Sequence, residues 1–416
     1  MSNNSLNENE NAGAIAHYSR SQEFKITYRT EEALLEINNA LNLCPQFAEA
    51  YTLRSGLYEQ LKLYDKALED INYSIFINNN NAESYYQRAT IYRRKKNFDL
   101  ALQDCQRCVL INPNFAIGYS RMGTIMGDLK QKNSELSYYN QAIDKDENCY
   151  YAFMCRGLYY FDEQMFNDAL RNFNQAIKIN PKYALAYYNR AILYNDIGEK
   201  DKALSDYNQA IQLDPKYVNA YNNRGNLYDD IGEKDKALSD YSQAIQLDPN
   251  CAMTYNNRAY TLRSELYEKM KLYDKALEDV NQSLSINNNN AESYYQRGTI
   301  YWRKQLFDLA LQDCMKCVQI NPNFAMGYSR MGTIMSDLKQ KDNELQYYNQ
   351  AIEKDENCYY AFICRGQYYY DEQMIDLALM DFNQAIQINP NYSLAYYNRG
   401  EYYYTQNIRH FIQRYW

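Results

Sequence analysis

The sequence predicts an all-α protein, an α-α superhelix built from antiparallel helix hairpins. Apolar residues recur at three- and four-residue steps through most of the 416 residues, which is the period of a helix with one buried face. The pattern also repeats every 34 residues, most clearly where residues 184–217 are followed by a near copy at 218–251. Because one short hairpin cannot bury its own apolar faces, such hairpins must stack on their neighbours.

Residues 184–217 divide into two helices joined by a turn. Gly198 lies between the two apolar stripes, where a left-handed conformation can end the first helix. Asp214 and Pro215 end the second helix, since a proline ring disfavours helical geometry in the preceding residue. Small residues are expected where the helix backbones approach most closely: Ala191, Ala203 and Ala210.

This unit resembles the tetratricopeptide repeat (TPR). The residues that carry the resemblance are Tyr187, Ala191, Tyr194, Ala203, Tyr207, Ala210 and Pro215. Equivalent residues match in phase over nearly the whole chain, as about 11 full repeats and a truncated twelfth. The resemblance implies that the first helices line an inner groove in which proteins of this family bind segments of their partners.

The phase of the repeats sets the domain organisation. Residues 1–13 are polar and Asn-rich and are expected to form a disordered tail, followed by repeats 1–7 at 14–251. Residues 261–400 copy residues 52–191 with an offset of 209, which is five residues more than six repeats. Repeat 8, at 252–290, therefore holds five extra residues, which turn a helix about 140° beyond a full turn. We expect a lengthened, kinked or bulged helix between 252 and 272. Repeats 9–11 occupy 291–392, and a truncated repeat with a C-terminal tail occupies 393–416.

Composition excludes several function classes. A net charge of −8 and a sequence pI of about 5.1 disfavour DNA, RNA and anionic membranes as partners. No apolar run approaches the roughly 18 residues of a membrane span, and the N-terminus lacks the basic and apolar regions of a secretory signal. Ten cysteines without such a signal predict reduced thiols and a cytoplasmic location.

We also expect no enzyme, metal or cofactor. Ser, His and Gly are not arranged as a nucleophile with its base or as a phosphate-binding loop. Cys105 with Cys108, and Cys314 with Cys317, have the spacing of half a metal site. Both pairs fall where the TPR pattern places core side chains, and the chain has only two histidines, so packing is the favoured interpretation.

Charged residues inside the repeat predict an internal ion pair. Most first helices carry Arg at one position and most second helices carry an acid at another, as with Arg190 and Asp206. Repeat 5 departs from this pattern by pairing Arg156 with an asparagine. Glu135 and Glu344 stand where the TPR pattern has Ala, so either the helices shift to admit a carboxylate or each finds a partner.

Groove residues follow from the resemblance. Amides offer both donors and acceptors, so a row of them suits the backbone of an extended peptide, or else only solvates a polar wall. The amide candidates are Asn189, Asn219, Asn222, Asn223, Asn226, Asn257, Asn398, Gln87 and Gln296. A second set comprises Arg93, Arg94 and Arg121 with their duplicates Trp302, Arg303 and Arg330. Guanidinium groups pair with carboxylates, so acidic segments are candidate ligands, with a solvated basic patch as the alternative.

The expected function is a non-enzymatic scaffold for protein–protein interaction. One alternative is the targeting part of a larger enzyme or co-chaperone assembly, although only Arg121 matches the carboxylate clamp that co-chaperone TPR domains use. An RNA-binding solenoid is a further alternative that the negative charge opposes. The apolar C-terminal tail at 407–416 either caps the last hairpin or pairs two chains into an oligomer.

Overall fold

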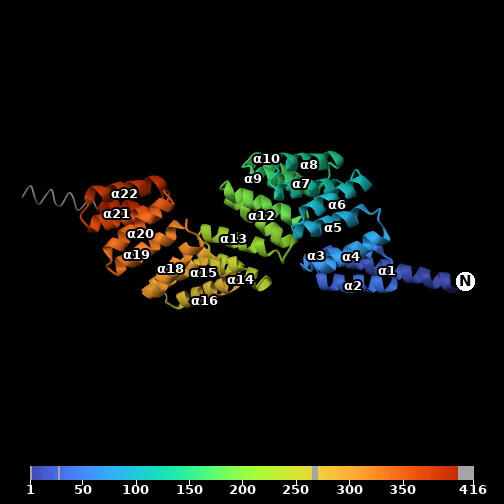
Figure 1. Ribbon diagram of the computed structural model, residues 1–416, viewed down its shortest axis with the longest axis horizontal. Coiled ribbons are helices and arrows are strands. Elements are labelled where there is room, and N and C mark those ends of the chain that lie inside the picture. The colour runs from blue at the N-terminus through green and yellow to red at the C-terminus, as the bar shows by residue number, and fades with distance from the viewer. Residues whose placement is uncertain (1, 27–28, 265–269, 402–416) are drawn as a thin grey trace, which may run out of the picture. The chain divides into compact units, whose positions relative to one another are not determined.

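The computed structural model describes residues 2–26, 29–264 and 270–401, and every regular element in these ranges is a helix. The chain forms two compact units, residues 1–214 and 215–416, which are drawn in Figure 1. Each unit is a stack of antiparallel helix hairpins, so the predicted fold class is confirmed.

The first unit holds repeats 1–6. Its helices are α1 (Ser2–Ile26), α2 (Thr30–Leu43), α3 (Ala48–Gln60), α4 (Tyr64–Ile77), α5 (Ala82–Arg94), α6 (Phe98–Ile111), α7 (Ala116–Asp128), α8 (Lys132–Lys145), α9 (Tyr150–Asp162), α10 (Phe166–Ile179), α11 (Ala184–Asp196) and α12 (Lys200–Leu213). Helix α1 begins at Ser2, whereas we expected residues 1–13 to be a disordered tail. The first helix of repeat 1 continues toward the N-terminus, where no proline interrupts it.

The second unit holds the remaining repeats. Its helices are α13 (Val218–Asp230), α14 (Lys234–Leu247), α15 (Ala252–Ser264), α16 (Met270–Ile286), α17 (Ala291–Arg303), α18 (Phe307–Ile320), α19 (Ala325–Asp337), α20 (Lys341–Lys354), α21 (Tyr359–Asp371) and α22 (Ile375–Ile388). Residues 393–401 are also helical. The tail at 402–416, which we expected to cap the stack or to pair chains, lies outside the described residues.

Small residues set the spacing within each hairpin. Ala191, Ala203 and Ala210 are fully buried, as predicted. At Gly225 an added Cβ would lie 2.7 Å from the ring of Tyr241 on the facing helix. The aromatic side chain of the second helix therefore packs directly onto the backbone of the first.

The turn between the two helices uses a left-handed residue in most repeats. Gly198 has a φ of +82° and Gly232 a φ of +83°, so the predicted helix end is confirmed. Seven other repeats place a side chain at the same position with a φ near +60°: Lys62, Lys96, Lys130, Gln164, Gln305, Lys339 and Gln373. Those turns are strained because a Cβ crowds the following carbonyl in this region.

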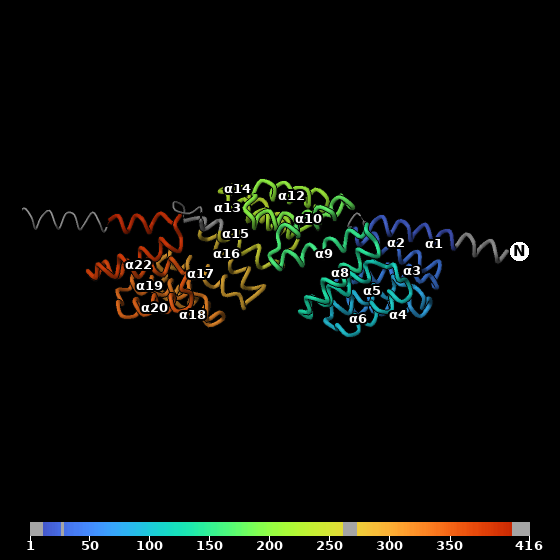
Figure 2. The backbone as a smooth tube through the Cα atoms, turned by 90° about the horizontal axis from the view of Figure 1, so that it is seen from above, coloured from blue at the N-terminus to red at the C-terminus, as the bar shows by residue number. Residues whose placement is uncertain are grey.

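Stacking gives each unit two different faces. A first helix such as α5 packs against its own second helix α6 and the preceding second helix α4, and it also touches the first helices α3 and α7. First helices therefore share one wall of the stack. Figure 2 shows α4 and α6 next to each other along the opposite edge of the first unit.

The irregular repeat 8 keeps its internal ion pair. Arg258 bonds to Asp279, 21 residues later, whereas Arg190 bonds to Asp206, 16 residues later. The five extra residues therefore lie between the paired groups. Helix α16 has 17 residues, and α14 has 14. Residues 265–269 lie outside the described part of the chain, so a lengthened, kinked or bulged helix remains a prediction.

Candidate functional site

A guanidinium clamp joins neighbouring hairpins in most repeats of both units, but not in repeats 4 and 10, which have Met122 and Met331 in place of the arginine. Arg190 shows it: Nε donates to Asp206 Oδ2 at 2.6 Å and Nη2 donates to Oδ1 at 2.8 Å. Its Nη1 donates to Asn174 Oδ1 of the preceding hairpin at 2.5 Å. The rings of Tyr187 and Tyr194 lie 5.6 and 5.7 Å from the guanidinium carbon. Three of the five N–H donors of the arginine are thus engaged within the chain, so the clamp holds the stack together.

The predicted ion pair is thus confirmed as part of this clamp. It recurs as Arg54–Asp70, Arg88–Asp104, Arg224–Asp240, Arg258–Asp279, Arg297–Asp313 and Arg365–Asp381. In repeat 5, Arg156 Nε donates to the amide oxygen of Asn172 at 2.9 Å instead. Sequence reasoning missed the asparagine that stands 16 residues before the arginine: Asn38, Asn72, Asn140, Asn281, Asn349 and Asn383.

The amide candidates of the second unit form a network of their own. Asn257 Nδ2 donates to Asn226 Oδ1 at 2.9 Å and to Asn222 Oδ1 at 3.3 Å. Asn222 is buried and donates to Asn223 Oδ1 at 3.4 Å, while the hydroxyl of Tyr241 donates to Asn226 at 2.9 Å. The structure therefore brings these four amides together, but largely as partners of one another within the wall.

The other amide candidates are scattered. Asn189 belongs to the first unit, where it is buried against the sulfur of Met154 at 3.8 Å. Gln296 is buried and donates to Glu292 at 2.8 Å, and Nε2 of Gln87 is buried without a hydrogen-bond acceptor among the described residues. Asn219 is exposed and Asn398 is half-buried. Peptide binding by the amide row stays a prediction.

The arginine candidates of the first unit have partners within the chain. Arg93 Nε donates to Asp128 Oδ2 at 2.5 Å, and Arg94 Nε donates to Glu59 Oε1 at 3.0 Å. Arg121 is buried and donates to the Tyr86 hydroxyl at 2.8 Å. These arginines therefore belong to the wall and are not a free basic patch.

The duplicates of these arginines in the second unit stack on one another. Trp302 Nε1 donates to Asp337 at 2.5 Å, so Trp302 takes the place that Arg93 has in the first unit. The guanidinium carbons of Arg330 and Arg303 lie 4.3 and 4.7 Å from the Trp302 ring, within range of cation–π attraction. Arg330 is 7% exposed, and its Nε and Nη1 have no hydrogen-bond acceptor among the described residues.

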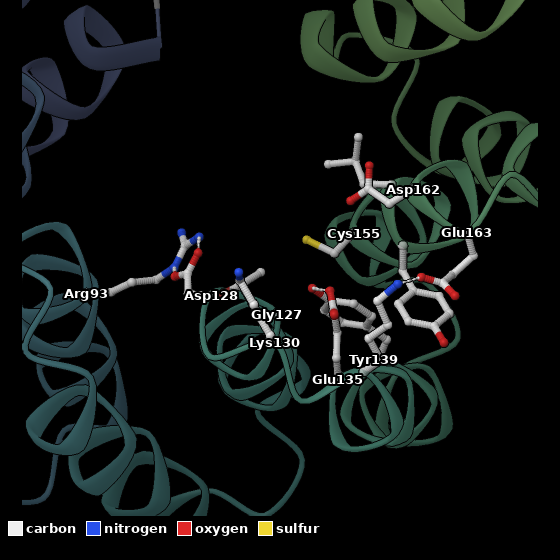
Figure 3. Close-up of a pocket in the computed structure, with 13 residues that line it drawn as sticks. Arg93, Gly127, Asp128, Lys130, Glu135, Tyr139, Cys155, Asp162 and Glu163 are labelled. Atoms are coloured by element: carbon white, nitrogen blue, oxygen red, sulfur yellow. Dashed lines mark hydrogen bonds and ion pairs between the residues drawn. The ribbon is translucent and has the colours of Figure 1, made fainter. Parts of the chain in front are cut away.

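The first unit contains a pocket of about 510 Å³ on the wall of first helices. Residues of α7, α8 and α9 line it, and Arg93 reaches it from α5. Figure 3 shows Glu135 from α8 and Asp162 from α9 pointing into the same space, with Cys155 between them. At the rim, Arg93 pairs with Asp128 and Lys132 pairs with Glu163.

Glu135, which does not fit the TPR pattern, faces Gly127 on α7. A Cβ at Gly127 would lie 2.7 Å from Glu135 Oε1. The Tyr139 hydroxyl donates to that oxygen at 3.2 Å. Burial raises the pKa of Glu135, and the nearby Asp162 raises it further; burial also raises the pKa of Asp162. Neither carboxylate forms an ion pair with a described residue.

In the second unit, two of the residues around the equivalent carboxylate differ from those that line this pocket. Ser336 stands where the first unit has Gly127, and Trp302 stands where it has Arg93. Glu344, the duplicate of Glu135, is buried, and burial raises its pKa as well. The two units therefore provide a natural pair of related sites with different space around the carboxylate.

The cysteine pairs occupy the core, as predicted. Cys105, Cys108, Cys314 and Cys317 are fully buried as free thiols, and burial raises the pKa of Cys105 to about 12. Within the described ranges, no group of three or more His, Cys, Asp or Glu side chains is placed to hold a metal ion. These thiols pack against their neighbours and are poor nucleophiles.

Family models for the tetratricopeptide repeat match residues 82–115, 218–251, 258–290 and 291–324, and a further TPR repeat model matches 157–198 and 193–232. The matches fall on hairpins of both units. The chain is a tetratricopeptide repeat protein. The phase read from the sequence agrees with these matches, since repeats 3, 7 and 9 begin where the models begin.

Several solved structures are similar to this TPR protein. A tetratricopeptide repeat protein from Parabacteroides merdae ATCC 43184 has a TM-score of 0.54 and 16% identity, over 61% of this chain and 98% of that chain. Yeast Tom70 has a TM-score of 0.47 and 16% identity, over 95% of this chain and 96% of that chain. No curated protein matches the sequence. None of the described helices has both the length and the apolar character needed to span a bilayer.

Proposed function

We propose that this TPR protein is a non-enzymatic scaffold that holds a segment of a partner protein on the wall of first helices. In the first unit, the segment inserts a lysine or arginine side chain into the pocket between α7, α8 and α9. The observation that carries this proposal is the pair of carboxylates, Glu135 and Asp162, which share that pocket without an ion-pair partner. A cytoplasmic location fits the free thiols of all ten cysteines.

The chemistry of the pocket favours a cation. Burial destabilises both ionised carboxylates, and a cationic group between them would remove that cost through charge-assisted hydrogen bonds. The volume of about 510 Å³ accommodates the end of a long side chain. The rim pairs Arg93–Asp128 and Lys132–Glu163 border the entrance, and the nearby Lys132 ammonium partly offsets the raised pKa of Glu135 and Asp162.

The pocket changes the expected charge of the partner segment from acidic to basic. Acidic segments were expected at Arg93, Arg94 and Arg121, but the first two are paired with carboxylates and the third is buried. The pocket is lined by four carboxylates (Asp128, Glu135, Asp162 and Glu163) and three cations (Arg93, Lys130 and Lys132), so its net charge is negative. Backbone contacts to neighbouring amides remain part of the proposal.

Selection of random peptides on the immobilised full chain tests this function. We expect the selected peptides to share a lysine or arginine at one position. For one such synthetic peptide, the double variant Glu135→Gln with Asp162→Asn should weaken binding at least tenfold, because each charged hydrogen bond contributes about 1.5–3 kcal/mol.

The second unit supplies the matched control. Glu344→Gln with Asp371→Asn changes the duplicated carboxylates and should leave the affinity unchanged. Gly127→Ser, which introduces the side chain found in the second unit, should weaken binding by filling the pocket. Selected peptides rich in acidic residues, or an affinity insensitive to the first double variant, would refute the proposed site.

A further inference from the structure

The outer face of the first unit exposes large apolar side chains. Phe76 on α4 is 81% exposed and Leu110 on α6 is 69% exposed. Tyr73 and Leu100 are also exposed on these helices, and the Tyr73 and Phe76 rings stack with centroids 6.1 Å apart. Single exposed apolar residues are ordinary, but several gathered on neighbouring helices mark an interaction surface.

Of these side chains, Leu100 and Leu110 line one depression of about 430 Å³, whereas the ring of Tyr73 packs on Tyr51 of α3 with centroids 4.8 Å apart. Its floor is formed by Tyr85, Arg88 and Tyr92 of α5. One side is α6, which contributes residues 100, 103, 107 and 110, a spacing that places them on a single helix face.

Helix α4 borders the other side of the depression. Arg88 on the floor donates from Nη1 to Asn72 Oδ1 at 2.9 Å. Phe76 follows Asn72 by four residues and therefore lies on the same face of α4, one turn along. Helix α5 packs against both α4 and α6, so Phe76 of α4 and the apolar side chains of α6 border one shallow groove above it.

The groove carries one cation that its own chain does not neutralise. The guanidinium carbon of Arg107 lies 6.0 Å from the Tyr85 ring, and Arg107 forms no ion pair with any described side chain. The nearby Asp104 is engaged by Arg88 at 2.7 Å. A ligand that covers the apolar residues would therefore meet an available positive charge beside them.

The duplicated hairpins keep a groove at the same place but replace three of the exposed apolar residues, although Met315 lines it and is 48% exposed. In the second unit, Tyr294, Arg297, Lys316 and Gln319 line the equivalent depression of about 550 Å³. Gln282, Ser285 and Gln319 stand where the first unit has Tyr73, Phe76 and Leu110. The clamp beneath is the same, since Arg297 bonds to Asp313 at 2.7 Å. Folding of the hairpins therefore does not require the exposed apolar residues.

We infer that the groove between α4 and α6 binds an amphipathic acidic helix of another protein. The helix would place apolar side chains over Phe76 and Leu110 and a carboxylate against Arg107. The surface lies on second helices, so it is independent of the pocket formed with the first helices.

Fluorescence anisotropy with the full chain tests the inference. The probe is a fluorescein-labelled peptide of 18 residues with leucine at helical i, i+4, i+7 spacing and glutamate elsewhere, and a matched peptide has lysine in place of glutamate. Wild type should bind the glutamate peptide at one site, at least tenfold more tightly than the lysine peptide. Arg107→Gln should reduce that preference several-fold while the circular dichroism spectrum stays unchanged.

The two units again provide matched variants. Tyr73→Gln, Phe76→Ser and Leu110→Gln together install the second-unit residues and should weaken the glutamate peptide at least tenfold. The reciprocal changes, Gln282→Tyr, Ser285→Phe and Gln319→Leu, should create a second site and raise the stoichiometry to two peptides per chain.

Three outcomes would overturn the inference. Equal affinity for the glutamate and lysine peptides would show unspecific apolar contact. An unchanged affinity in the triple variant that still folds would place the peptide elsewhere. Self-association of the wild type that the triple variant abolishes, without peptide competition, would make a second copy the occupant.

Discussion

Removing the carboxylate from one guanidinium clamp should destabilise its hairpin strongly. Asp206→Ala leaves Nε and Nη2 of Arg190 without acceptors beneath the rings of Tyr187 and Tyr194. Loss of one partner costs about 3–5 kcal/mol for a buried pair, and an exposed pair contributes only about 0–1 kcal/mol. The side chains of Arg190 and Asp206 are 18% and 8% exposed, which places this pair near the buried limit. Because Asn174 still accepts from Nη1, we expect the low end, about 3 kcal/mol.

Hydrogen exchange measured by mass spectrometry is the appropriate assay. Stacked repeats can open locally, so a single unfolding transition need not report on one hairpin. A loss of about 3 kcal/mol corresponds to roughly a hundredfold drop in protection, and it should be centred on α11 and α12. Protection that falls less than fivefold would mean that the pair behaves as an exposed one, and the structural role assigned to the clamp would be wrong.

Repeat 5 provides the reverse change. Asn172→Asp would give Arg156 the carboxylate that the other clamps have. The stabilising contribution is the free-energy difference between a charged and a neutral hydrogen bond to Arg156. From it must be subtracted the hydrogen bond that the Asn172 amide now donates to the Asp168 carbonyl at 2.8 Å, which the aspartate cannot make. We expect a stabilisation of about 1 kcal/mol, seen as slower exchange in α9 and α10. Faster exchange in these helices would contradict the reasoning that an Arg–Asp clamp stabilises the hairpin more than an Arg–Asn clamp.

Three further outcomes follow from the same structure. Gly198→Ala should cost about 1 kcal/mol in urea unfolding through backbone strain alone, because an added Cβ there meets no atom within 4 Å; an unchanged midpoint would contradict this. Burial raises the pKa of Glu135 in the folded state, so its contribution to stability is lost as pH rises from the unfolded value through the folded one. Glu135→Gln should therefore raise the melting temperature at pH 7 and remove that part of the pH dependence, and equal melting curves would argue against a buried carboxylate. Iodoacetamide should label the half-buried Cys44 and Cys251 far faster than the buried Cys105 in the native chain, as peptide mapping can measure.

The fold and the clamp carboxylate were predictable because both depend on position within one repeat. The helical period and the repeat length together fix which residues are buried, and Arg190 and Asp206 stand out as a charged pair in an otherwise consistent pattern. The clamp asparagine was missed because asparagine is common throughout the chain, so Asn174 gave no contrast with its surroundings.

The contacts of the site were less predictable because they join residues 35 positions apart, one more than the repeat length of 34. Arg93 bonds to Asp128 and Asn257 bonds to Asn222, each across 35 residues. Trp302 and Asp337 are separated in the same way. Comparing equivalent positions 34 residues apart aligns repeats correctly, but it does not reveal that the neighbour across the wall stands one residue further along. A search for complementary side chains at a separation of 35 would have found these pairs.

The two units share the residues that stabilise the hairpins and differ at the residues of the two proposed binding sites. The clamp is preserved in the duplicated hairpins, as Arg88–Asp104 and Arg297–Asp313 show. The differences lie at the two proposed sites: Gly127 against Ser336 in the pocket, and Phe76 against Ser285 on the outer face. Since each pair of residues is compatible with the same packed hairpin, an exchange between units changes the surface and leaves the core contacts in place. A binding effect that follows the exchanged residues, in either unit, is therefore attributable to recognition and not to folding.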